Sequence, residues 1–226
     1  MRAGELAFRH APRVLPLRRI GGYHGTNKAK IVNLGLSYLD IYERYLQGWR
    51  GRTFALLELG VYRGESLRMW RTYFPKARVY GLDIDPAAAE RLRGEFTVFT
   101  GSQSDETFVT NTLGEIGPGL NLVVDDASHI NELTIASFDL IFPRLPAGAL
   151  YVIEDLAPET YQAAWPTAPG IEHNVGVSLE NRREQFDDFI EELIHDADAM
   201  GSGRWGEGRA VSFVHAWPGL LVVGRA

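Results

Sequence analysis

The sequence contains no cysteine, and this absence narrows the chemistry open to it. Without thiols there is no disulfide framework, no thiolate zinc site, no iron–sulfur cluster and no cysteine nucleophile. Any metal ion must therefore bind to oxygen or to histidine.

Long apolar runs are also absent. No stretch approaches the roughly 18–20 apolar residues of a membrane helix, and the N-terminus lacks the apolar block of a secretory signal. We therefore expect a cytoplasmic protein with no membrane contact. The net charge of −6 argues against a nucleic-acid partner, because neutralising phosphates requires a clustered positive surface.

Charge is distributed unevenly along the 226 residues, which suffice for one sizeable domain. Residues 1–50 carry nine basic and three acidic residues, whereas residues 182–199 carry two basic and seven acidic ones. The basic start and the acidic segment are therefore candidate contacts between copies in a homo-oligomer. Residues 1–29 lack a sustained apolar period and predict a basic arm, which leaves residues 30–226 as a single domain.

Beyond residue 30, short apolar runs alternate with helical patterns. The predicted strands are residues 53–59, 79–82, 96–100, 120–124 and 150–153, and the predicted helices are residues 30–46, 66–73, 105–113, 131–142 and 182–199, with one more beginning at Pro86. Continuous apolar strands separated by helices are typical of a parallel sheet covered on both faces. The sequence therefore predicts the α/β class. Residues 210–215 and 220–224, joined by a Pro-Gly turn, predict a final antiparallel hairpin.

The ends of the first two strands indicate a nucleoside site, since ligands of open parallel sheets bind at the carboxyl ends of strands. The first strand runs from Glu58 into Gly60 and Gly64 and then into a helix, although a plain tight turn would read the same way. Asp83 ends the second strand, where an acid can accept hydrogen bonds from ribose hydroxyls. The dinucleotide fingerprint G-x-G-x-x-G has a second glycine two residues after the first, but Gly60 is followed by Val61, Tyr62 and Arg63. S-adenosylmethionine, a nucleoside without phosphates, therefore fits best, and its ammonium suits Glu58 or Asp125.

Three carboxylates finish two further strands: Asp126, Glu154 and Asp155. Like charges repel one another, and a divalent cation bound to oxygen relieves that repulsion. Mg²⁺ suits such a site, and Mn²⁺ is the natural substitute. The competing interpretation is that Glu154 and Asp155 cap the next segment or pair with arginine.

These motifs resemble known enzymes. The E-L-G-x-x-x-G turn from Glu58, the G-L-D-I-D segment from Gly81 and the final hairpin look like a class I S-adenosylmethionine-dependent methyltransferase. D-D-A-S-H-I-N from Asp125 and Y-V-I-E-D from Tyr151 resemble the metal-dependent sugar O-methyltransferases of macrolide tailoring. Cephalosporin hydroxylase-type proteins have a similar core. The resemblance covers about residues 25–155. Ala127 and Asn27 depart from the glycine and aspartate that this family commonly carries.

The resemblance implies a Rossmann-like, mostly parallel seven-stranded sheet with a C-terminal antiparallel hairpin. It also implies an O-methyltransferase of antibiotic biosynthesis that uses S-adenosylmethionine and Mg²⁺ on a sugar hydroxyl of a glycosylated small molecule. His129, which follows Asp126 at the strand-to-helix transition, would be the general base, a role for which histidine side chains are generally suited. A helix cap or a surface residue is the plainer interpretation of His129.

We assign cofactor contacts by position. Glu58, Gly60 and Gly64 would line the methionine part, Asp83 would bind the ribose, and Ser102 and Gln103 would lie near the adenine. Asp125 would face the cofactor's amino group while Asp126 turns to the metal, since neighbours at a strand end point apart.

Residues 156–181 have no clear period and predict a substrate lid beside the active end of the sheet. Two other functions are compatible with the sequence: methylation of a phenolic or catechol acceptor, and an NAD-dependent oxidoreductase. The missing glycine and the carboxylate cluster disfavour the oxidoreductase.

Overall fold

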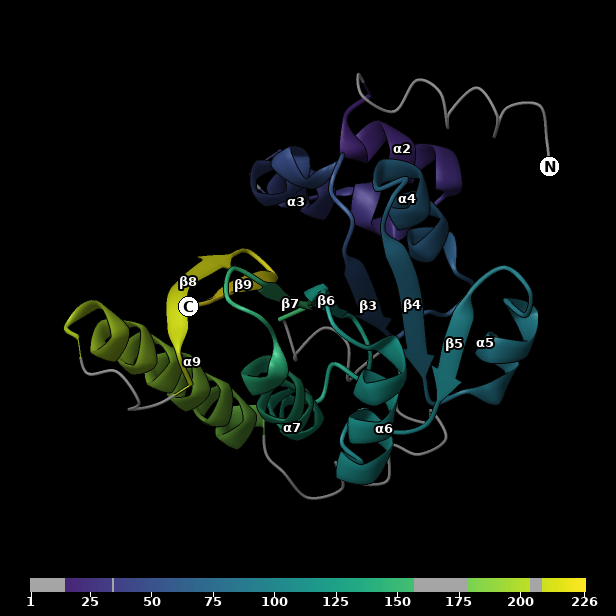
Figure 1. The fold of residues 1–226 in the computed structure, drawn as a ribbon. Coiled ribbons are helices and arrows are strands. Elements are labelled where there is room, and N and C mark those ends of the chain that lie inside the picture. Colours follow the sequence, from purple (N-terminus) through teal and green to yellow (C-terminus); the bar gives the residue numbers. More distant parts are fainter. Residues whose placement is uncertain (1–14, 34, 157–178, 204–208) are drawn as a thin grey trace. The chain divides into compact units, whose positions relative to one another are not determined.

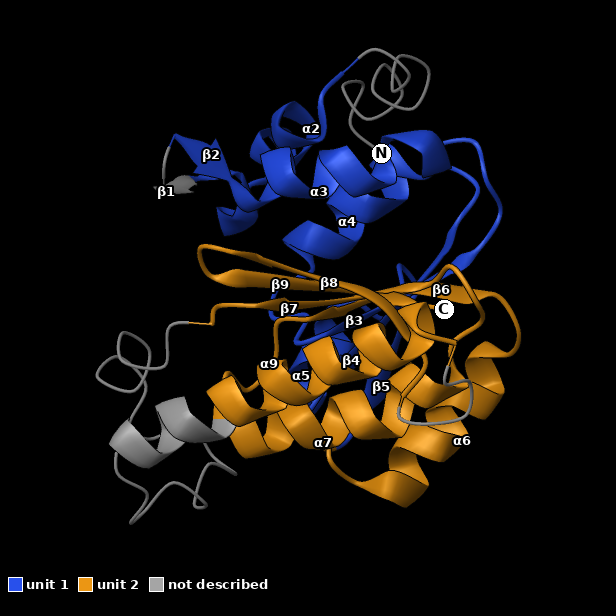
Figure 2. Ribbon diagram, turned by 90° about the vertical axis from the view of Figure 1, so that its left-hand side faces the viewer, with its two compact units in different colours: residues 1–101 blue, residues 102–226 orange. Residues whose placement is uncertain are grey.

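The computed structural model describes residues 15–33, 35–156, 179–203 and 209–226 (Figure 1). The chain divides into two compact units, residues 1–101 and residues 102–226 (Figure 2). The predicted lid at residues 156–181 lies outside the described residues except at its two ends. The predicted single domain over residues 30–226 stays a prediction.

Three parallel strands form the sheet of the first unit. They are β3 (Ala55–Leu59), β4 (Arg78–Asp83) and β5 (Thr97–Thr100), in the order β5-β4-β3. Every residue of β3 is buried, which explains why all of them except Glu58 are apolar. The crossover helices are α4 (Glu65–Tyr73) and α5 (Pro86–Arg91), and α5 begins where Asp85 caps it and proline occupies its first turn.

The start of the chain differs from the predicted arm. Residues 17–24 form the helix α2 (Leu17–His24), in which Leu17 and Ile20 are fully buried, and residues 27–29 form the short helix η1 (Asn27–Ala29). The arm is therefore a wrong prediction for residues 17–29, because two apolar residues of this basic segment pack inward while its arginines stay exposed. Residues 1–14 lie outside the described part of the chain.

The helix predicted from residue 30 begins later. A small antiparallel pair, β1 (Ile31–Asn33) and β2 (Leu36–Ser37), precedes α3 (Tyr38–Leu46) and the short η2 (Gln47–Trp49). Ser37 fixes the helix start, because its hydroxyl accepts from the Asp40 backbone N–H while the Asp40 carboxylate accepts from the Ser37 N–H.

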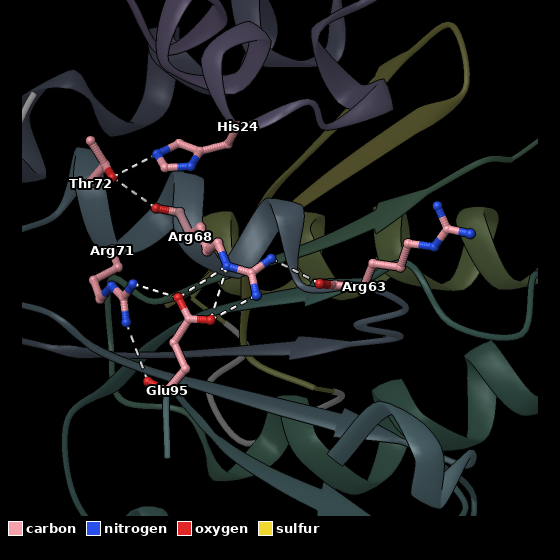
Figure 3. A network of polar contacts seen from close by, with 6 residues as sticks. All are labelled: His24, Arg63, Arg68, Arg71, Thr72 and Glu95. Carbon is pink, nitrogen blue, oxygen red and sulfur yellow. Dashed lines mark hydrogen bonds and ion pairs between the residues drawn. The ribbon is translucent and has the colours of Figure 1, made fainter. Parts of the chain in front are cut away.

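Glu95 fastens α4 to the segment before β5 (Figure 3). The guanidinium groups of Arg68 and Arg71 each donate to its carboxylate, at 2.7 Å in the shortest contact of each. Thr72, on the same helix, hydrogen-bonds His24 of α2 at 2.8 Å. Burial raises the pKa of Glu95, but the arginine hydrogen bonds and charges outweigh it, so the net pKa is lowered.

The second unit carries the other four strands. They are β6 (Leu120–Asp125), β7 (Leu150–Glu154), β8 (Val211–Trp217) and β9 (Leu220–Arg225), in the order β6-β7-β9-β8. β6 and β7 are parallel, and β9 is antiparallel to both of its neighbours, so the predicted hairpin is confirmed.

Three helices of this unit lie on the same side of its strands in Figure 2. They are α6 (Glu106–Ile116), α7 (Asn131–Ile141) and α9 (Leu179–Gly201), and the short η3 (Phe142–Arg144) follows α7. Phe138 of α7 centres an aromatic core, with ring centroids 4.9 Å from Tyr151 of β7 and 5.2 Å from Phe189 of α9.

Apart from the β1–β2 pair, the two units supply seven strands, mostly parallel and ending in an antiparallel hairpin, and this confirms the predicted α/β class. Among the described helices, none combines the length and apolarity needed to cross a membrane.

Candidate active site

The turn after β3 is built on two glycines. Gly60 and Gly64 both have φ +79°, a left-handed conformation that other residues rarely adopt. A Cβ added at Gly64 would lie 2.5 Å from a side-chain methyl of Leu92. The turn therefore requires glycine at Gly64 for space as well as for conformation.

Asp83 holds this turn in place. Its carboxylate accepts from the backbone N–H groups of Val61 at 2.9 Å and Tyr62 at 3.1 Å, and its other oxygen accepts from Asp85 N–H at 2.9 Å. The acid expected at the ribose thus fixes the end of β4 against the glycine turn. Its contact with a ribose stays a prediction.

Glu58, at the end of β3, is fully buried and has a cationic partner. Lys28 Nζ lies 3.3 Å from Glu58 Oε1, and the side chains of the two residues are 2% and 0% exposed. Ser66 Oγ donates to the other Glu58 oxygen at 2.7 Å. The sequence placed Glu58 near the methionine part of the cofactor but missed this ion pair, although Lys28 belongs to the Gly25–Lys28 segment that the resemblance includes.

The second unit brings one acid–histidine cluster together. Asp126 and His129 follow β6, Asp155 follows β7, and His129 Nε2 lies 3.8 Å from a carboxylate oxygen of each aspartate. The three side chains are 12% to 20% exposed, so water and a ligand can reach them. His129 and Asp155 have φ values of +53° and +58°, and such strained backbone is characteristic of functional sites.

The cluster differs in one member from the predicted metal ligands. Donor atoms of Asp126, His129 and Asp155 all lie within 4.8 Å of one another, and Glu154 is not among them. Glu154 is the last residue of β7 and is only 3% exposed, whereas Asp155 lies just beyond the strand. The role of Glu154 as a ligand stays a prediction from the carboxylates at the strand ends.

Asp125 and Asp126 have different neighbours, and the expected contact of Asp125 with the cofactor's amino group stays a prediction. The Asp125 carboxylate is buried and accepts from Ser137 Oγ at 2.7 Å and from Tyr151 OH at 2.9 Å. Burial raises the pKa of Asp125 to about 6, although the hydrogen bonds from Ser137 and Tyr151 oppose this shift. The sequence does not predict either partner, because Ser137 and Tyr151 meet Asp125 only in the folded structure.

The two residues assigned to the adenine have neighbours within their own unit. Gln103 is buried, and its amide nitrogen lies 3.1 Å from Ser137 Oγ and 3.4 Å from the Asp125 carboxylate. Ser102 Oγ lies 3.0 Å from Ser104 Oγ. Their contact with adenine stays a prediction, and Gln103 has a structural task that the sequence did not reveal.

Two known proteins resemble this chain in sequence. Demethylmacrocin O-methyltransferase of Streptomyces fradiae is 39% identical over 171 residues, which cover 72% of this chain and 41% of that protein. Mycinamicin VI 2''-O-methyltransferase of Micromonospora griseorubida is 38% identical over 133 residues, covering 55% and 32%. In sequence the chain is similar to both of these O-methyltransferases. No protein-family model matches it.

A solved structure of a macrolide-type enzyme has the same fold. It is the MycE methyltransferase of the mycinamycin biosynthetic pathway in complex with Mg, SAH and mycinamycin VI. The TM-score is 0.69 with 26% sequence identity, and the match covers 94% of this chain and 55% of that one. The resemblance read from the motifs and the Rossmann-like methyltransferase fold are therefore confirmed. The chain spans less than half the length of the two curated relatives.

Proposed function

We propose that the chain is the catalytic part of a metal-dependent O-methyltransferase. Its cosubstrate is S-adenosylmethionine, and its acceptor is a sugar hydroxyl of a glycosylated natural product in the cytoplasm. The observation that carries the proposal is the cluster of Asp126, His129 and Asp155, at the ends of β6 and β7 in a chain similar to macrolide-type O-methyltransferases.

The cluster fits a hard divalent cation. It offers carboxylate oxygens of Asp126 and Asp155, which are the ligands that Mg²⁺ and Mn²⁺ prefer, with the His129 imidazole beside them. His129 Nε2 lies 3.8 Å from a carboxylate oxygen of each aspartate, which places the proposed base beside the proposed ligands.

Asp126 and Asp155 would hold the ion, with Glu154 as the third carboxylate that the strand ends in the sequence predict. A bound ion supplies Lewis acidity, which lowers the pKa of an acceptor hydroxyl. His129 is the general base that takes the hydroxyl proton at Nε2. The acceptor oxygen forms its bond to the methyl carbon as the carbon–sulfur bond breaks, and S-adenosylhomocysteine leaves.

In the first unit, the glycine turn and Asp83 would bind the nucleoside. The backbone at Gly60 and Gly64 lets a ligand approach closely, and Asp83 accepts hydrogen bonds from ribose hydroxyls. Glu58 would face the methionine part. In the second unit, Ser102 would lie near the adenine.

The test is methyl transfer from labelled S-adenosylmethionine to a panel of deoxysugar glycosides and catechols, with Mg²⁺ and with EDTA. We expect methylated glycoside only when metal is present. Transfer to catechols alone would replace the acceptor class, and turnover unchanged by EDTA would remove the metal from the mechanism. Calorimetry with NAD and with S-adenosylmethionine decides against the oxidoreductase when only the latter binds.

A further inference from the structure

The loop that carries Asp126 and His129 is held from the side by a buried amide. This loop, residues 126–129, joins β6 to the segment before α7. Its Ser128 backbone N–H donates to Gln103 Oε1 at 3.2 Å, and its Ala127 backbone N–H donates to the Asp125 carboxylate. The backbone N–H groups of two successive loop residues therefore donate to side chains outside the loop.

Gln103 is itself fixed at its other end. Its amide nitrogen has Ser137 Oγ at 3.1 Å, the Leu133 carbonyl oxygen at 3.3 Å and both Asp125 oxygens at 3.4 Å. Gln103 is only 6% exposed. A buried side-chain amide whose nitrogen and oxygen are both hydrogen-bonded has one stable orientation, because exchanging the two atoms by rotation would leave them without suitable partners.

Asp125 is hydrogen-bonded to two further residues of this network. It accepts from Ser137 on α7 and from Tyr151 on β7, and Tyr151 OH also lies 3.3 Å from Ser137 Oγ. Gln103 itself precedes α6, whose first turn is capped by Asp105. The brace, which we define as Gln103, Asp125, Ser137 and Tyr151, thus connects α6, α7 and β7 to the loop.

The loop needs such support because of its backbone. His129 has φ +53°, and a non-glycine residue in this region costs about 1–3 kcal/mol unless its surroundings hold it. Its conformation decides where the imidazole of His129 and the carboxylate of Asp126 lie.

We propose that Gln103 is a positioning residue for the metal site. Through Ser128 it holds the 126–129 loop in the conformation that brings Asp126 and His129 to Asp155. This inference rests on the proposed function, since it takes the cluster to be a metal site, and it replaces the expected contact of Gln103 with adenine. Residues that orient ligands from outside the coordination sphere typically change metal affinity about 10–100-fold when they are replaced.

The test measures metal and cofactor binding separately on the full chain. Mn²⁺ affinity is measured by electron paramagnetic resonance without cofactor or acceptor, and S-adenosylhomocysteine affinity by calorimetry. We expect Gln103→Met to bind Mn²⁺ about tenfold more weakly while its S-adenosylhomocysteine affinity stays within twofold of wild type. The matched control is Gln47→Met, the same replacement at an exposed position, which should leave both affinities unchanged.

Tyr151→Phe tests the same brace with almost no change in volume, so the result does not depend on whether Gln103→Met folds. It removes the hydroxyl that donates to Asp125, and we expect a several-fold loss of Mn²⁺ affinity that the surface control Tyr23→Phe does not show. Unchanged Mn²⁺ affinity in Tyr151→Phe would overturn the positioning role. Weaker cofactor binding with intact Mn²⁺ binding in Gln103→Met would return that residue to the adenine. A wild-type chain that binds no Mn²⁺ would instead overturn the metal site of the proposed function, and this inference with it.

Discussion

Lys28 and Glu58 form an ion pair from which water is excluded. The Lys28 ammonium lies 3.3 Å from the Glu58 carboxylate, and neither side chain is more than 2% exposed. Removing one partner of such a pair leaves a buried charge without its counterion, which is more damaging than removing both.

We therefore expect Lys28→Met to lower the free energy of unfolding by about 3–5 kcal/mol, because Glu58 loses its counterion. The double variant Lys28→Met/Glu58→Gln should recover much of this loss. Urea denaturation of the wild type, the two single variants and the double variant gives the coupling energy. The exposed Lys30→Met is the control, and additive losses in the double variant would mean that the pair is not coupled.

Gly64 has a left-handed backbone and a close neighbour, and comparison with Gly94 separates the effects of these two features on stability. Gly64 has φ +79° and Leu92 lies 2.5 Å from the position of an added Cβ, whereas Gly94 has φ +78° and no neighbour within 4 Å. Gly94→Ala should lose only the roughly 1–3 kcal/mol of backbone strain, and Gly64→Ala should lose more. Shortening the neighbour in Gly64→Ala/Leu92→Ala tests the collision. Equal losses for the two glycines in thermal unfolding would contradict the steric part.

The ion pairs of Glu95 make stability depend on pH in a direction that can be worked out. Burial raises the pKa of this carboxyl, but Arg68 and Arg71 outweigh burial and lower it below the ordinary 4.5 (Figure 3). The pairs therefore stabilise the fold above pH 4.5, and this stabilisation is lost as the pH falls through the lowered native pKa. Because the partners are about 30% exposed, each pair contributes no more than about 1 kcal/mol. Unfolding free energies measured from pH 7 to pH 3 should differ between wild type and Glu95→Gln near neutrality and converge in acid.

The strands could be predicted from the sequence because β3 and β6 are buried almost throughout and therefore read as apolar runs. Glycine or acidic residues marked their ends. The helix α2 could not be predicted, because its pattern is short and contains Gly21, where a methyl group would collide with Leu39. The glycine that weakens the helical pattern is thus the residue that lets α2 pack closely.

In the candidate site, too, one group of residues could be predicted from the sequence and another could not. Residues at strand ends could be named in advance, since topology alone places them at one edge of a sheet. Their partners could not: the pairing of Lys28 with Glu58 and of Tyr151 with Asp125 depends on which side chains meet in the buried interior. For that reason the sequence assigned Glu58 and Asp125 to the cofactor, while the structure adds a cation beside the first and a hydroxyl beside the second.

The sequence predicts Glu154 as a metal ligand and His129 as the general base, whereas the cluster of close donor atoms contains His129 and not Glu154, and metal binding decides between the two residues. His129 Nε2 lies 3.8 Å from Asp126 and from Asp155, while the carboxylates at the strand ends predict Glu154 as a ligand. A general base acts on the proton and not on the ion, so His129→Ala should keep Mn²⁺ affinity within about threefold while turnover falls at least 100-fold. Glu154→Gln should weaken Mn²⁺ binding at least tenfold, as should Asp155→Asn. Electron paramagnetic resonance titration and a methyl-transfer assay on the same preparations measure both quantities. The opposite ranking, with Mn²⁺ lost in His129→Ala and kept in Glu154→Gln, would make the histidine a ligand and leave the acceptor proton to another group.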